Sequence, residues 1–134
     1  MSEIHFKSEE HRRFYFAMLD RCRVDDCYHR AFFYVAGISA ETRTHIDSLF
    51  DFEQDQIRLT GLRGGWQTSG TSQICRLAFN LWNGYTGSKD RADYTPYELF
   101  RCGYAPYFME GIKLRYPEYC RDLNKTKRAP DWAR

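Results

Sequence analysis

The sequence predicts an all-α, or nearly all-α, single domain: a compact bundle of about five to six helices over residues 1–120, followed by a basic C-terminal tail over 121–134. Several segments carry apolar residues at helical spacing, and most of these segments begin at a capping residue or end at a glycine. Only one stretch, near 56–59, alternates polar and apolar residues as a short β piece does. With 43% hydrophobic and 28% charged residues in 134, the composition is that of a globular domain.

The first two expected helices are bounded by capping residues. Ser8 is a suitable N-cap for a helix that ends near Cys22, and two glutamates follow it where the helix dipole favours negative charge. Asp25 or Asp26 caps the second helix, and Gly37 is placed to end it. The apolar stripes are expected at Phe14, Tyr15, Met18, Leu19 and Cys22, and at Tyr28, Ala31, Phe32 and Val35.

A third helix is expected to start at Ser39 and to bury Ile46, Leu49 and Phe50. Because the links are short, these three helices are predicted to be consecutive antiparallel neighbours. Glycines then interrupt residues 51–72, and the alternating stretch 56–59 has no recognisable partner strand.

The segment 73–83 has the clearest helical pattern. Five apolar residues fall at i, i+3, i+4, i+7 and i+8, and Asn83-Gly84 supplies a C-terminal stop. Since its polar strip is narrow, we expect this helix to run through the centre, with Leu77, Leu81 and Trp82 nearly fully buried. The five apolar residues are Ile74, Leu77, Ala78, Leu81 and Trp82.

Two further helices are expected near the end of the domain. Thr95-Pro96-Tyr97-Glu98 has the order of a complete capping box, with proline at the first helical position. After Gly103, the last helix should start at Ala105-Pro106 and stop before Pro117.

Charge and hydropathy narrow the classes of function. The net charge of +2 is too small for a general nucleic-acid or membrane binder. The tail, 121–134, has a net charge of +3, so residues 1–120 have a net charge of −1. No apolar run approaches a membrane span, and the N-terminus has no signal-peptide core. An odd number of cysteines, five, is typical of reduced thiols. We therefore expect a cytoplasmic protein.

No enzymatic template fits the sequence. It holds neither a phosphate-binding glycine loop nor a GxSxG elbow, so no catalytic residue is predicted. His11 and His45 lie near the apolar sides of their helices, where a core histidine bonded to a backbone carbonyl is expected rather than a general base. The pattern Cys22-x4-Cys27-x-His29 resembles part of a zinc-binding motif, but no second pair of ligands lies at a suitable spacing. Neither a metal nor a cofactor is therefore expected.

Five residues are candidates for a binding surface. Helical phase puts Phe16 and Phe33 opposite the apolar stripes of their helices, on outward faces where large rings can anchor a partner. The alternative is that both helices are buried on two sides. Trp66, Arg76 and Asn80 are candidates for a pocket, and the alternative for Arg76 and Asn80 is a surface stripe or an arginine paired with an acidic residue.

Four segments of the chain resemble a family of short uncharacterised proteins from Gram-positive bacteria and their phages and mobile elements. The resemblance runs from about residue 5 to residue 120 and is most specific from Trp66-Gln67-Thr68 into Leu77-Ala78-Phe79-Asn80-Leu81. No activity is assigned to that family, so no site residue is carried over. The segments are HIDSLFDF (45–52), WQTSGTSQICRLAFNLWNG (66–84), YTPYELF (94–100) and RYPEY (115–119).

Together these observations favour a small cytoplasmic binding protein. The resemblance implies an inhibitor or adaptor of phage or mobile-element origin that contacts a host protein, such as a component of an antiviral defence system. Two alternatives stay open. One is a binder of a small ligand, such as a nucleotide signal, through Trp66, Arg76 and Asn80. The other is a small enzyme whose residues converge only in the fold.

Overall fold

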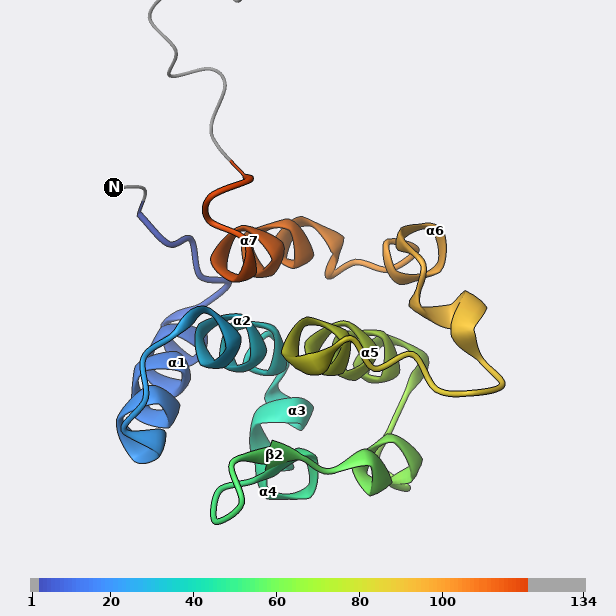
Figure 1. Cartoon of the computed structure of the whole chain (residues 1–134), viewed down its shortest axis with the longest axis horizontal. Helices are drawn as coiled ribbons and strands as arrows, with labels where there is room; N and C mark the ends of the chain where they lie inside the picture. Colours follow the sequence, from blue (N-terminus) through green and yellow to red (C-terminus); the bar gives the residue numbers. More distant parts are fainter. Residues whose placement is uncertain (1–2, 121–134) are drawn as a thin grey trace, which may run out of the picture.

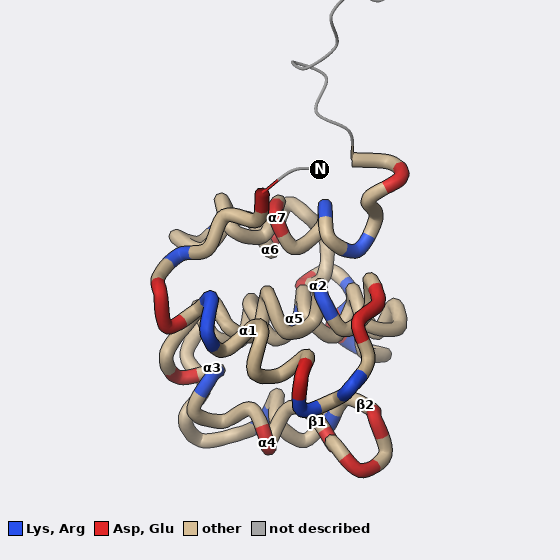
Figure 2. Tube along the Cα trace, turned by 90° about the vertical axis from the view of Figure 1, so that its left-hand side faces the viewer, with Lys and Arg blue, Asp and Glu red and all other residues tan. Residues whose placement is uncertain are grey.

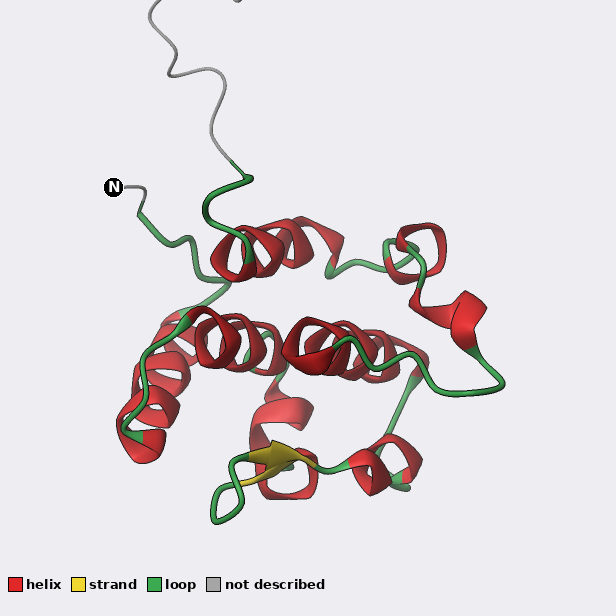
Figure 3. Ribbon diagram, in the orientation of Figure 1, coloured by secondary structure: helices red, strands yellow, loops and turns green. Residues whose placement is uncertain are grey.

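A computed structural model describes residues 3–120 and contains, within that range, seven α-helices, two 3-10 helices and one two-stranded sheet (Figures 1 and 3). This confirms the predicted, mainly helical fold. The expected basic tail, 121–134, lies outside the described residues. The elements are α1 (Glu9–Cys22), α2 (Cys27–Ala36), α3 (Ala40–Thr44), α4 (Ile46–Leu49), β1 (Phe50–Asp51), β2 (Gln56–Ile57), η1 (Leu59–Arg63), α5 (Ser69–Asn83), η2 (Arg91–Tyr94), α6 (Pro96–Leu99) and α7 (Ala105–Arg115).

α2 is the central helix, with α1, α5 and α7 packed around it (Figure 1). Every residue from Ala31 to Ala36 is buried, because this half of the helix is apolar on all sides. The expected outward face for Phe33 is therefore wrong. The Phe33 ring has no exposed surface. Its centre lies 5.1 Å from the centre of the Phe50 ring in β1 and 5.8 Å from the centre of the Phe52 ring in the turn after β1.

α5 lies alongside α2 and forms the second half of the core. The Thr68 hydroxyl accepts the N–H of Thr71, and the Thr71 hydroxyl accepts the N–H of Thr68, so a reciprocal capping box starts the helix. Gly84, at φ 80°, ends it in the left-handed region. Leu77 and Leu81 are buried as predicted, whereas Trp82 stays partly exposed and the central position belongs to α2.

The predicted third helix is split into α3 and α4, after which the chain becomes extended. Phe50 pairs with Ile57 and Asp51 with Gln56 in an antiparallel sheet, so the predicted β piece exists at 56–57, and its partner strand begins at Phe50, which was expected to belong to the third helix. Ile46, Leu49 and Phe50 are buried as predicted. α3 packs against α5, so the first three helices do not form a simple antiparallel row.

The last two helices complete one wall of the molecule. At α6, the Thr95 hydroxyl accepts the N–H of Glu98, but the Glu98 carboxylate pairs with Arg101, so only half of the predicted capping box forms. In α7, a Cβ on Gly111 would lie 2.4 Å from Cγ2 of Val35. The glycine therefore permits α7 to approach α2 closely.

None of the helices within residues 3–120 is long and apolar enough to cross a bilayer. Basic and acidic positions are interspersed over the segments seen in Figure 2. Basic and acidic residues are therefore not segregated into separate segments of the part of the chain that the structure describes.

Candidate functional site

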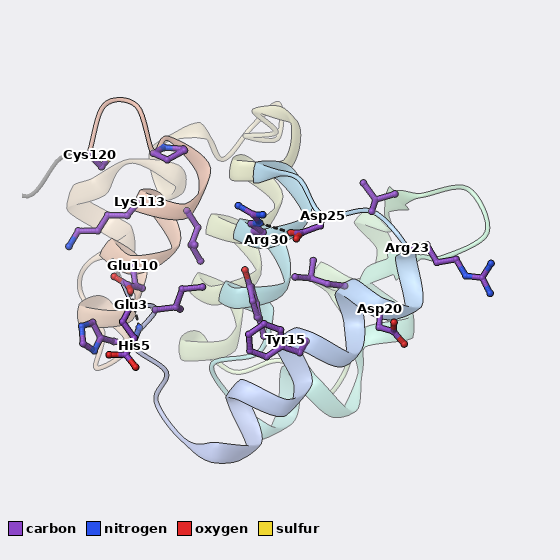
Figure 4. A pocket seen from close by; sticks show the side chains of 16 residues that line it. Glu3, His5, Tyr15, Asp20, Arg23, Asp25, Arg30, Glu110, Lys113 and Cys120 are labelled. Atoms are coloured by element: carbon purple, nitrogen blue, oxygen red, sulfur yellow. Dashed lines mark hydrogen bonds and ion pairs between the residues drawn. The ribbon is translucent and has the colours of Figure 1, made fainter. Parts of the chain in front are cut away.

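A groove of about 1120 Å³ lies between the N-terminal segment, α1, the start of α2 and α7 (Figure 4). Apolar and charged side chains both line it. The apolar ones include Ile4, Phe16, Leu19, Val24 and Leu114, and the charged ones are Glu3, Asp20, Arg23, Asp25, Arg30, Glu110 and Lys113.

Two hydrogen bonds hold the N-terminal segment in place beside the groove. The His5 N–H donates to Oε2 of Glu110 in α7 at 2.9 Å, and the Tyr34 hydroxyl of α2 donates to the His5 carbonyl. Phe6 packs its ring against Tyr15 and Tyr34, with ring centres 5.4 and 5.7 Å apart. These contacts hold the segment against α7 and α2 and so fix one wall of the groove.

An ion pair and a phenol are among the polar groups that line the groove (Figure 4). Nε of Arg30 donates to Oδ1 of Asp25, and this hydrogen bond lowers the pKa of the Asp25 carboxyl. Burial raises the pKa of Tyr15 to about 12, so the hydroxyl stays neutral at physiological pH. Neither the ion pair nor the phenol is poised to exchange a proton near neutrality.

The five candidate residues occupy separate places. Phe16 is 49% exposed and lines the groove, whereas Phe33 is buried in the core. Trp66 stacks on His45, with ring centres 4.3 Å apart, beside a smaller hollow that neither Arg76 nor Asn80 lines.

Arg76 and Asn80 both hold the segment that follows α5. Arg76 lies 3.8 Å from the Asp93 carboxylate, and the Asn80 amide donates to the Tyr85 carbonyl at 3.3 Å. Trp66, Arg76 and Asn80 therefore do not form the single ligand pocket that sequence reasoning allowed.

His11 is the core histidine that the sequence predicted. Its Nδ1 accepts the Lys7 N–H at 3.1 Å, so the ring proton is on Nε2, which donates to the Tyr34 carbonyl at 2.7 Å. Burial lowers the pKa of His11 to about 4 and keeps the ring neutral. His45 differs from the prediction, because it is partly exposed and stacks on Trp66.

A second polar cluster joins Cys22, His29 and Asp55, whose Sγ, ring nitrogen and carboxylate oxygen lie within 4.8 Å of one another. Sequence reasoning paired Cys22 with Cys27, but the Cys27 Sγ accepts from Arg115 at 3.7 Å. Asp55 was missed because it comes from a loop whose position depends on the β1–β2 pairing. Burial raises the pKa of the Cys22 thiol to about 11, which opposes a nucleophilic thiolate.

Comparison with known proteins gives one match. A model described as a family of unknown function (DUF6075) matches residues 1–128. The chain belongs to this family. No curated protein and no solved structure matches it significantly. Within residues 3–120, this DUF6075 member has two candidate sites, the groove and the Cys22 cluster.

Proposed function

We propose that this protein acts by binding another protein, and that a segment of the partner lies in the groove between α1 and α7. The observation that carries the proposal is the groove itself. Its volume of about 1120 Å³ is at the upper end of the range of roughly 300–1,000 Å³ typical of small-molecule pockets, and it leaves room for a polypeptide segment. An apolar surface flanked by charges of both signs suits a polypeptide segment that buries apolar side chains and keeps its polar groups in water.

Phe16 is the anchor of the proposed interface. Its ring is half exposed, yet it packs edge-on against Tyr15, at 5.0 Å between ring centres, and lies 6.0 Å from Phe6. The Arg12 guanidinium is 5.5 Å from its centre. A ring held on one side and open on the other offers apolar area at little entropic cost, as interface hot spots do.

The partner we propose is a host protein, such as a component of an antiviral defence system, which this protein inhibits or recruits by direct contact. Support comes from the resemblance to proteins of phages and mobile elements. The placement of Trp66, Arg76 and Asn80 in separate surroundings disfavours the competing small-ligand site.

The test begins with purification of the partner from the native host and continues with affinity measurements on the purified pair. Phe16→Asp should weaken binding at least tenfold, about 1.4 kcal/mol, and leave the thermal unfolding midpoint nearly unchanged. Met109→Asp is the matched control, because Met109 is 48% exposed on α7 but does not line the groove. If Phe16→Asp binds as tightly as the parent, the groove is not the interface.

A further inference from the structure

Three segments that are distant in sequence bring metal-ligating side chains together at one edge of the molecule. Cys22 is the last residue of α1, His29 lies in the first turn of α2, and Asp55 is in the turn between β1 and β2. Their potential ligand atoms all lie within 4.8 Å of one another. Sulfur, imidazole nitrogen and carboxylate oxygen are the three donor types that proteins present to Zn²⁺.

The hydrogen bonds of His29 show which ring nitrogen faces the cluster. Oδ1 of Asp26 lies 2.7 Å from Nδ1, and because a carboxylate only accepts, Nδ1 must carry a proton. Nε2 lies 2.8 Å from Oδ1 of Asp55, which is also an acceptor. At 2.8 Å this second contact requires a second ring proton, unless Asp55 moves back far enough for both atoms to bind one cation.

The surroundings of His29 match a zinc-binding imidazole. In protein zinc sites the nitrogen that does not bind the metal commonly donates to a carboxylate, which fixes the orientation of the ring. Asp26 does this here, and the same Oδ1 accepts the His29 backbone N–H at 2.9 Å as the N-cap of α2. His29 is 3% exposed, so the ring is held by its packing as well.

We propose that Cys22, His29 and Asp55 form a Zn²⁺ site, with Asp26 orienting the imidazole and water at the fourth position. Tetrahedral coordination with bonds of about 2.0–2.3 Å separates ligand atoms by about 3.3–3.8 Å. The cluster reaches that spacing if Asp55, an exposed turn residue, withdraws slightly from Nε2 and the ligand atoms that lie up to 4.8 Å apart move closer together. Binding would release the Cys22 thiol proton and join α1, α2 and the hairpin turn.

The alternative explanation is a charged network without metal, in which an imidazolium bridges two carboxylates and the thiol is a neighbour only. Cys22 distinguishes the two explanations. It is essential to the zinc site and dispensable to the network.

The test uses the tag-free, full-length protein, stripped with a chelator and titrated with Zn²⁺ by calorimetry against a competing chelator. Co²⁺ serves as a spectroscopic probe for thiolate ligation and tetrahedral geometry. We expect one Zn²⁺ per chain, a rise in the unfolding temperature on binding, and a Co²⁺ spectrum with a thiolate charge-transfer band. A chain that takes up no Zn²⁺ under these conditions overturns the proposal.

Variants assign the ligands. Cys22→Ser and Asp55→Asn should each weaken Zn²⁺ binding at least a hundredfold, and Asp26→Asn, which retains a capping oxygen, should weaken it about 10–100-fold. Cys27→Ser is the matched control, because Cys27 lies at the other end of the link between α1 and α2. This variant should bind Zn²⁺ as tightly as the parent does. Because Asp55 is exposed, Asp55→Asn remains informative even if a Cys22 variant folds poorly. Unchanged affinity in Asp55→Asn, or loss of binding in Cys27→Ser, would place the metal elsewhere and refute the site.

Discussion

His11 and His29 show how strongly the surroundings of a single residue decide its chemistry. His11 has one acceptor and one donor as partners, so a neutral ring satisfies both nitrogens. His29 has two carboxylates as partners, so a neutral ring leaves one contact between two acceptors. Both rings are buried, and the difference lies only in which groups face them.

Acidification should destabilise the fold through His11. The ordinary pKa of 6.5 applies in the unfolded chain, and burial lowers the folded value to about 4. As the pH falls from 6.5 to 4, the unfolded state binds a proton that the folded state does not, and up to about 3 kcal/mol of stability is lost. Urea unfolding at several pH values should show this loss, and it should be reduced in His11→Gln, which cannot titrate. A pH dependence in His11→Gln identical to that of the parent would contradict the assignment.

The two phenylalanines proposed as outward anchors should now behave in opposite ways. Phe33→Ala removes a fully buried ring and should cost about 3–5 kcal/mol in the free energy of unfolding. Phe16→Ala removes a half-exposed ring and should cost about 1 kcal/mol or less. Chemical denaturation of the two variants side by side is the measurement. Equal destabilisation would mean that α1 buries Phe16 more deeply than the structure shows.

At the scale of the helices, the N-terminal caps differ in their hydrogen bonding, and the sequence pattern did not predict which cap is the more complete. Thr95-Pro96-Tyr97-Glu98 has the pattern of a capping box, yet the Thr95 hydroxyl accepts the Glu98 N–H of a four-residue helix at 3.4 Å and donates to the Ala92 carbonyl at 2.9 Å. Thr68 and Thr71 form a reciprocal box at the head of a fifteen-residue helix. The usual capping-box pattern has glutamate or glutamine at the N3 position, so it did not identify this box, which has threonine there.

Removing the two caps should therefore cost different amounts. Thr68→Ala should lower the free energy of unfolding by about 1 kcal/mol or more, because α5 is part of the core and loses an acceptor for the Thr71 N–H. Thr95→Ala should cost less, because its bond is longer and its helix shorter. Denaturation midpoints of the two variants give the comparison, and a larger effect at Thr95 would reverse the ranking.

Over the whole molecule, the close approach of α7 to α2 connects the core to the groove. Gly111 lies against Val35, and the same helix supplies Glu110, Lys113 and Leu114 to the groove. The distance between these two helices therefore sets both the packing of the core and the position of one groove wall.

Gly111→Ala should push α7 away from α2. The added methyl would lie 2.4 Å from Val35, and strain of this kind costs about 1–3 kcal/mol, which exceeds the gain in helix propensity of up to about 1 kcal/mol. Thermal unfolding should show the destabilisation, and the double variant Gly111→Ala with Val35→Ala should recover part of it. A Gly111→Ala variant as stable as the parent would show that the two helices have room to spare.

The sequence by itself determined the helices and most of their ends. Ser8, Asp26 and Gly84 act on backbone groups within one turn of themselves, so their roles follow from local order. Buried stripes such as Leu77 and Leu81 follow from helical periodicity in the same way.

Only the tertiary structure decided which faces meet. Phe33 is buried because β1 and the turn after it cover a side of α2 that periodicity assigned to water. Asp55 reaches His29 because Phe50 pairs with Ile57, and Phe16 borders a groove because residues 3–8 cross to α7. Each of these contacts joins residues far apart in the chain, and local propensity and periodicity hold no information about such pairs. The groove proposed for binding and the proposed metal site both consist of such contacts, so they emerged only from the fold.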